Sequence, residues 1–192
     1  RYWCRHRKIQ PRSHLYGGDK AIFGYGSPSS VVTAVTNLVS NLGVVSGDVT
    51  GVGTARSGLA AAGYGGDKGI FGYGLSIPAS AVYSLTNLVS NTGVVGTDVT
   101  GVGTARYGLA AASYGGDKAI FGYGYSFITY TQYSLTNLVS NTGVVSTDVT
   151  GVGSVRAALA AAGYGGDKAI FGYGNDNPMG SNVLNMTNKV SN

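Results

Sequence analysis

The chain has 192 residues, enough for one domain with a hydrophobic core, and only 11% of them are charged, against about 25% in typical soluble domains. Glycine occurs 33 times, which favours many tight turns and argues against long helices. The net charge of +5 comes from the first fifteen residues, because the rest of the chain has equal numbers of cationic and acidic residues; composition therefore excludes a chain-wide basic surface for nucleic acid.

Residues 1–15 form a basic leader without acidic residues, whose cations are Arg1, Arg5, Arg7, Lys8 and Arg12. The single cysteine, Cys4, also lies there, which excludes an internal disulfide. Because the chain starts without an initiator Met or a signal-peptide segment, we expect it to be processed or cut from a longer product. Binding of nucleic acid through the leader is a minor hypothesis, since a short basic tail is usually solvated.

The remainder, residues 16–192, repeats with a period of about 50 residues. The string Tyr-Gly-Gly-Asp-Lys-(Ala/Gly)-Ile-Phe-Gly-Tyr-Gly begins at Tyr16, Tyr64, Tyr114 and Tyr164. The string Thr-Asn-(Leu/Lys)-Val-Ser-Asn begins at Thr36, Thr86, Thr136 and Thr187. Asp-Val-Thr-Gly-Val-Gly begins at Asp48, Asp98 and Asp148.

Each unit predicts four strands, here numbered in the third unit. Residues 107–114 form the first strand, and the glycine-rich turn after them leads into a second strand over 118–124. A variable loop precedes a third strand near 132–139, and a fourth follows near 144–150. Four short strands repeated at this period predict an all-β fold, a β-propeller of four-stranded blades.

Three alanine runs, at residues 60–62, 110–112 and 160–162, lie in the first strand of their units. A helix is the rival interpretation, because alanine is the best helix former. The runs are short and closed by Tyr-Gly-Gly, so we interpret them as the innermost strands, where small side chains fit around the propeller axis.

Residues 105–124 read Ala-Arg-Tyr-Gly-Leu-Ala-Ala-Ala-Ser-Tyr-Gly-Gly-Asp-Lys-Ala-Ile-Phe-Gly-Tyr-Gly. This order of an arginine, a small-residue strand, a hairpin and an apolar strand resembles the kelch repeat, over residues 16–192. The closing Gly-Tyr-Gly and the missing late tryptophan make it a divergent type, similar to repeat proteins of marine phages and environmental sequences. The resemblance implies a β-propeller and an extracellular or virion location, but no particular function.

The number of blades stays open. Strands two and three occur four times, but the fourth and first strands between them occur only three times. Three alternatives follow: the leader supplies a first strand and closes a four-bladed ring, another chain completes the ring, or the sequence is a fragment of a longer chain.

Residues present in every unit are expected to be structural. The tyrosines of Gly-Tyr-Gly are expected to pack between blades, and they include Tyr73, Tyr123 and Tyr173. Each unit is also expected to be stabilised by a charge pair between an aspartate and the arginine eight residues later. The aspartates are Asp48, Asp98 and Asp148, and the arginines are Arg56, Arg106 and Arg156.

The sequence offers few side chains suited to catalysis, since the chain has no Glu and its two histidines, His6 and His14, lie in the leader. No Ser-His-Asp arrangement, metal site or cofactor motif is predicted. We therefore expect a protein that is not an enzyme and needs neither metal nor cofactor.

Differences in length between the units are confined to the loops between strands two and three, and the sequences of these loops are unlike. Loops at equivalent places share one face of a propeller, and variable loops on a rigid scaffold are typical of recognition surfaces. Aromatic and polar loop residues are the candidate ligand contacts: Tyr125, Phe127, Tyr130, Tyr133, Asn175, Asp176 and Asn177. The sequence thus predicts a non-catalytic binding or adhesion propeller for a glycan or protein surface. The alternative is a structural protein whose copies complete a larger ring as a homo-oligomer.

Overall fold

The computed structural model describes residues 12–29, 31–176 and 182–192. The regular elements of these residues are all β-strands, which form four three-stranded antiparallel sheets. The predicted all-β class is therefore confirmed. Within each sheet the strands keep their chain order, so every connection is a hairpin between neighbours.

The strands repeat in groups of three. The first strands are β1 (Arg12–Tyr16), β4 (Ala60–Tyr64), β7 (Ala110–Tyr114) and β10 (Ala160–Tyr164). The second strands are β2 (Lys20–Gly26), β5 (Lys68–Ser76), β8 (Lys118–Ser126) and β11 (Lys168–Gly172). The third strands are β3 (Thr33–Val39), β6 (Ala81–Val89), β9 (Thr131–Val139) and β12 (Thr187–Val190). Strand β1 starts inside the segment assigned to the leader.

The turn between first and second strands explains why the alanine runs are strands. Gly115 and Gly116 have φ values of 61° and 79°, in the left-handed region that glycine enters without a Cβ clash. This reversal pairs Tyr114 with Lys118 and carries the ladder along to Ala110 and Gly122. The prediction of strand rather than helix for these runs is confirmed.

The fourth strand predicted near 144–150 is not a regular strand in the described chain. The segment follows β9 and bridges it at two positions, Thr136 with Val149 and Val139 with Val145. Between the bridges, the Leu138 N–H donates to the Ser146 hydroxyl at 3.0 Å, while the Ser146 N–H donates to the Leu138 carbonyl at 2.8 Å. Here a side chain takes the place of a backbone partner, and only two isolated bridges join the segment to β9, so this edge is irregular.

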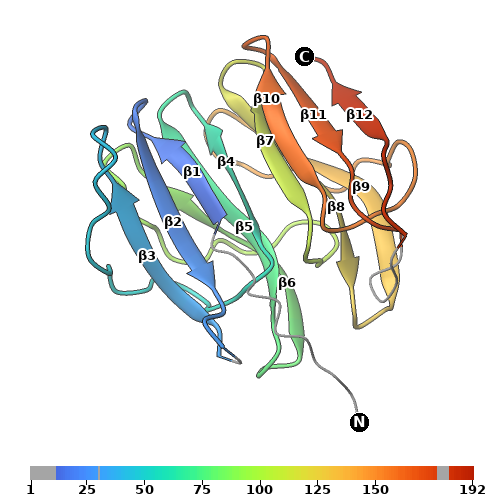
Figure 1. The fold of residues 1–192 in the computed structure, drawn as a ribbon, viewed down its shortest axis with the longest axis horizontal. Helices are drawn as coiled ribbons and strands as arrows, with labels where there is room; N and C mark the ends of the chain where they lie inside the picture. Colours follow the sequence, from blue (N-terminus) through green and yellow to red (C-terminus); the bar gives the residue numbers. More distant parts are fainter. Residues whose placement is uncertain (1–11, 30, 177–181) are drawn as a thin grey trace.

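The four sheets pack against one another in chain order, with β1 beside β4, β4 beside β7 and β7 beside β10. The sheets that contain β3 and β12 lie toward opposite ends of the longest axis (Figure 1). Turns between first and second strands gather at the top of this view, and the hairpins between second and third strands point the other way (Figure 1). Equivalent loops therefore share an edge, as expected.

The hydrophobic core lies between successive sheets. The Phe121 ring meets the Tyr73 ring edge-on, with centroids 5.2 Å apart. It also covers Gly72, where an added Cβ would lie 2.6 Å from the Phe121 ring. Glycine is needed here for this close approach. The same stack recurs at the other two junctions, as Tyr25–Phe71 and Tyr123–Phe171.

Candidate functional site

The hairpins between second and third strands are the variable part of the structure. In the third sheet β8 runs to Ser126 and β9 begins at Thr131, which leaves a turn of four residues, 127–130. The second sheet has a turn of the same length, 77–80. The fourth residue of each turn is left-handed, with φ of 52° at Tyr130 and 48° at Ser80. The two turns therefore have the same length and the same left-handed fourth residue, and they differ in their side chains.

The turn of the third sheet presents an uncharged surface with both apolar and hydroxyl groups. Tyr130 is 82% exposed and the neighbouring Ile128 is also exposed. The hydroxyls of Thr129 and Tyr133 are hydrogen-bonded at 3.1 Å, which ties the turn to β9. We call Ile128, Thr129, Tyr130 and Tyr133 the loop face.

Two predicted contact residues support this surface instead of forming it. Tyr125 is buried in β8, and its ring packs edge-on against Tyr107 at 5.5 Å. Phe127 is half-buried, 6.1 Å from the same Tyr107 ring. The expectation that Tyr125 lies in the loop is corrected, because β8 continues beyond Gly124.

Sequence reasoning missed Tyr107, whose ring packs against the rings of both Tyr125 and Phe127. Burial raises the pKa of Tyr107 to about 12, so the hydroxyl stays protonated near neutral pH. A signal was present, because the equivalent positions are Ser57 and Ala157. This position varies together with the loop that it supports.

The fourth sheet contributes to the same edge. The Gln132 side chain on β9 donates to the Asn175 carbonyl at 3.2 Å, which links the loops of the third and fourth sheets. Asp176 is exposed beside this link, and Asn177 lies outside the described residues. The Asn175 side-chain oxygen is buried and has no hydrogen-bond partner within the described part of the chain.

The repeated arginine lies at the centre of each internal unit. Arg106 is fully buried, and its guanidinium donates to the Tyr123 carbonyl at 2.7 Å, the Thr104 carbonyl at 2.9 Å and the Asn137 side chain at 2.6 Å. It also lies over the Tyr73 ring of the preceding sheet, 4.4 Å from its centroid. Burial lowers the pKa of Arg106 from its usual value. This residue joins two sheets, which is a structural role.

The charge pairs differ from the predicted spacing. Asp148 pairs with Arg106 at 3.8 Å, and Asp98 pairs with Arg56 at 4.0 Å. Neither aspartate pairs with the arginine eight residues after it, because that arginine precedes the next sheet. Each aspartate follows the third strand of its own sheet and pairs with the arginine that precedes the first strand of that same sheet. Burial raises the pKa of Asp148, but hydrogen bonds from Thr104 and Asn137 and the charge of Arg106 bring it below its usual value.

The repeated tyrosines pack between sheets at the internal junctions. Tyr73 and Tyr123 are buried, and their hydroxyls donate to the Val102 and Val152 carbonyls at 3.2 and 3.1 Å. Tyr173, at the last sheet, is 61% exposed. Tyr73 and Tyr123 thus lie between sheets, whereas Tyr173 has no such cover among the described residues.

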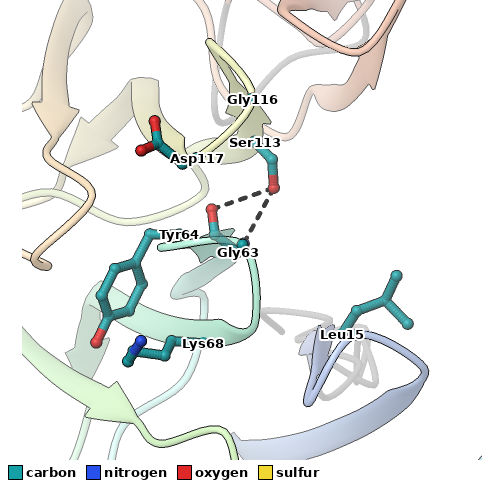
Figure 2. Close-up of a pocket in the computed structure, with 9 residues that line it drawn as sticks. Leu15, Gly63, Tyr64, Lys68, Ser113, Gly116 and Asp117 are labelled. Atoms are coloured by element: carbon teal, nitrogen blue, oxygen red, sulfur yellow. Dashed lines mark hydrogen bonds between the residues drawn. The ribbon is translucent and has the colours of Figure 1, made fainter.

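A pocket of about 140 Å³ lies at the opposite edge from the loop face, among the turns of three sheets. Figure 2 shows Ser113 beside Gly63, with Lys68 and Asp117 nearby; the Ser113 hydroxyl donates to the Gly63 carbonyl at 3.1 Å. Sites for small organic ligands usually measure about 300–1,000 Å³, so this pocket is too small for such a ligand.

Among the residues that the structure describes, no three His, Cys, Asp or Glu side chains are grouped to hold a metal ion. The same residues include no helix long and apolar enough to cross a membrane. Neither a protein-family model nor a curated protein matches the chain.

Proposed function

We propose that the four sheets are successive blades of a kelch-like β-propeller and that the chain is a non-catalytic recognition module. Packing of the first strands in chain order supports blades arranged around an axis. The bridged segments that follow β3, β6 and β9 support an irregular fourth strand at the edge of these three blades. An extracellular or virion location belongs to the same proposal and rests on the resemblance to phage-type repeats.

The loop face is the proposed recognition surface, and the exposure of Tyr130 is the observation that carries it. A tyrosine exposed by 82% at the tip of a hairpin offers an aromatic face and a hydroxyl to a partner. The neighbouring Ile128 is apolar and Thr129 is polar, so the surface is neutral and amphipathic. Such side chains suit a neutral glycan or a protein surface.

The two equal turns give a matched experiment. Replacing residues 127–130 with the sequence of residues 77–80 keeps the turn length and the left-handed fourth residue. We expect this chimera to keep its circular dichroism spectrum and to lose binding to an array of neutral oligosaccharides that the wild type binds. Unchanged array binding by the chimera would contradict the loop face as the binding surface.

The proposal includes no catalysis, metal or cofactor, since residues 16–192 contain no Glu, His or Cys. Nucleic-acid binding through the leader stays a minor alternative, and steep salt dependence would identify it. The other alternative, copies that complete one another's ring, depends on the end sheets and not on the loop face.

A further inference from the structure

The two end sheets carry the separate halves of one interface that occurs three times inside the chain. We propose that the last sheet of one copy docks on the first sheet of a second copy, through this same interface. The partner is thus a second copy of this chain. The inference does not depend on the loop face.

The last sheet exposes the side that every internal sheet buries. Tyr173 is 61% exposed, whereas its counterpart Tyr123 is 2% exposed under Phe171. Tyr164 is also exposed, while the equivalent Tyr114 is buried. We call this side the donating face; it consists of Tyr164, Gly165, Gly172 and Tyr173.

Gly172 is itself buried, but the direction of its Cβ is more open than at the internal counterparts of this glycine. A Cβ added at Gly72 or Gly122 would lie within 3.0 Å of a phenylalanine ring from the next sheet. A Cβ added at Gly172 would meet only the Thr187 methyl group, at 3.4 Å. The strand therefore has room for a phenylalanine ring that none of the described residues places there.

The first sheet exposes the complementary side. Phe23 is half-buried, whereas Phe71, Phe121 and Phe171 are fully buried against a preceding sheet. Gly43 is exposed with no atom within 4 Å of an added Cβ. We call this side the receiving face; it consists of Asp19, Phe23, Gly43 and Val45.

The internal counterparts of Gly43 show what this position receives. The ring of Tyr16 lies 2.9 Å from a Cβ added at Gly93, and Tyr64 lies at the same distance from one added at Gly143. Each tyrosine precedes a Gly-Gly turn, as Tyr164 does. Gly43 therefore has room for a tyrosine ring, and Tyr164 is an exposed tyrosine that lacks such a contact among the described residues.

The two faces match position by position. Docking in the internal geometry places Phe23 over Gly172 and against Tyr173, and Tyr164 against Gly43. It also brings the Gly165 N–H to the Asp19 carbonyl, as the Gly115 N–H donates to the Asp167 carbonyl at 2.7 Å inside the chain.

A buried polar atom beneath the donating face supports the same conclusion. The Nε–H groups of Arg56 and Arg106 each donate at 2.7 Å to the carbonyl of their own sheet's tyrosine, Tyr73 and Tyr123. The Nε of Arg156 is buried and has no partner within the described residues. Docking presses Tyr173 into the buried position of its counterparts, where its carbonyl can accept this hydrogen.

Because the two faces differ, the contact is heterologous and repeats from copy to copy until a ring closes or a filament grows. The end sheets lie toward opposite ends of the long axis (Figure 1), so one copy can hold two neighbours at once. Analytical ultracentrifugation of the wild-type chain over a wide concentration range should show a mass rising above the 19.5 kDa monomer.

Two variants remove one face each. Gly172→Val fills the open space on the donating face, and Phe23→Ser removes the ring of the receiving face. Each variant alone should remain monomeric with an unchanged circular dichroism spectrum. If Phe23→Ser does not fold, Val45→Lys on the exposed part of the same face replaces it.

A mixture of the two variants is the decisive sample, because each retains the face that the other has lost. We expect the equimolar mixture to form a dimer although neither component does. Tyr130→Ala, on the loop face, should assemble like the wild type, which separates this proposal from the proposed recognition surface. A wild type that stays monomeric at every concentration, or single variants that assemble normally, would overturn the proposal.

Discussion

At the scale of single residues, the buried arginine of each unit connects neighbouring sheets. Arg106 bonds to groups on its own sheet and covers the tyrosine of the preceding one. A planar guanidinium can satisfy several carbonyls while its face stacks on a ring, which an ammonium cannot do. The sequence needs arginine here for its shape as well as for its charge.

Replacing this arginine with lysine tests the argument. Arg106→Lys should lower the free energy of unfolding by about 3 kcal/mol, because buried acceptors and Asp148 lose their partner. Arg156→Lys should cost less than half as much, since Arg156 Nε is already unpaired and no carboxylate pairs with Arg156 within the described residues. Urea unfolding of both variants gives the comparison, and equal losses would contradict it.

At the scale of elements, the segments after β3 and β9 each contain one serine whose side chain bonds to the neighbouring strand. Ser146 bonds through its hydroxyl to the Leu138 N–H, and Ser46 does the same with Leu38. The second sheet has Gly96 at this position, with the backbone bond to Leu88 retained at 2.8 Å. The second unit thus keeps the backbone geometry without the side-chain bond.

Gly96→Ser should therefore stabilise the protein. A Cβ at Gly96 meets only the Leu88 carbonyl, at an ordinary 3.5 Å. The added hydroxyl bond and the reduced freedom of the unfolded chain should together contribute about 1 kcal/mol, or roughly 3 °C in Tm. Thermal unfolding checks this, with Ser146→Gly as the reciprocal variant that should lose a similar amount. A lower Tm for Gly96→Ser would show that the geometry differs between units.

The same elements show which parts of the fold can be predicted from the sequence. Turn glycines and apolar runs predict the first three strands of each unit, because local backbone chemistry determines them. The segment near 144–150 alternates like a strand, but the pattern does not show that only two isolated bridges join it to β9. The loop before β9 is shorter than predicted, since a register shift between Gly122 and Gly124 lets pairing continue past Tyr123.

The candidate site residues divide in the same way, into those that the sequence predicts and those that only the fold reveals. Repetition identifies the structural arginines and tyrosines, but only the fold shows that Asp148 reaches Arg106 and not Arg156. The predicted aspartate–arginine pairs were wrong, because spacing along the chain does not show which residues an antiparallel sheet brings together. Tyr107 was missed because it lies outside the loop that it supports.

At the scale of the whole molecule, the sheets form a row in which each contacts its neighbours in chain order. Stability in such an arrangement is close to a sum of terms for each unit and each junction. The internal sheet of β7 has junctions on both sides, whereas the last sheet buries only one side within the described chain. The first sheet likewise has a single junction, so opening should start at the end sheets, of which the last sheet is one.

Two identical four-residue segments make this measurable by hydrogen exchange. Residues 109–112 and 159–162 both read Leu-Ala-Ala-Ala, so their intrinsic exchange rates match closely. At low protein concentration the amides of residues 160–162 should exchange more than about tenfold faster, which corresponds to about 1.4 kcal/mol less local stability. At high concentration, docking of a second copy should slow exchange at 160–162 and leave 110–112 unchanged. Equal protection of the two strands at low concentration would mean that the donating face is already covered within the single chain.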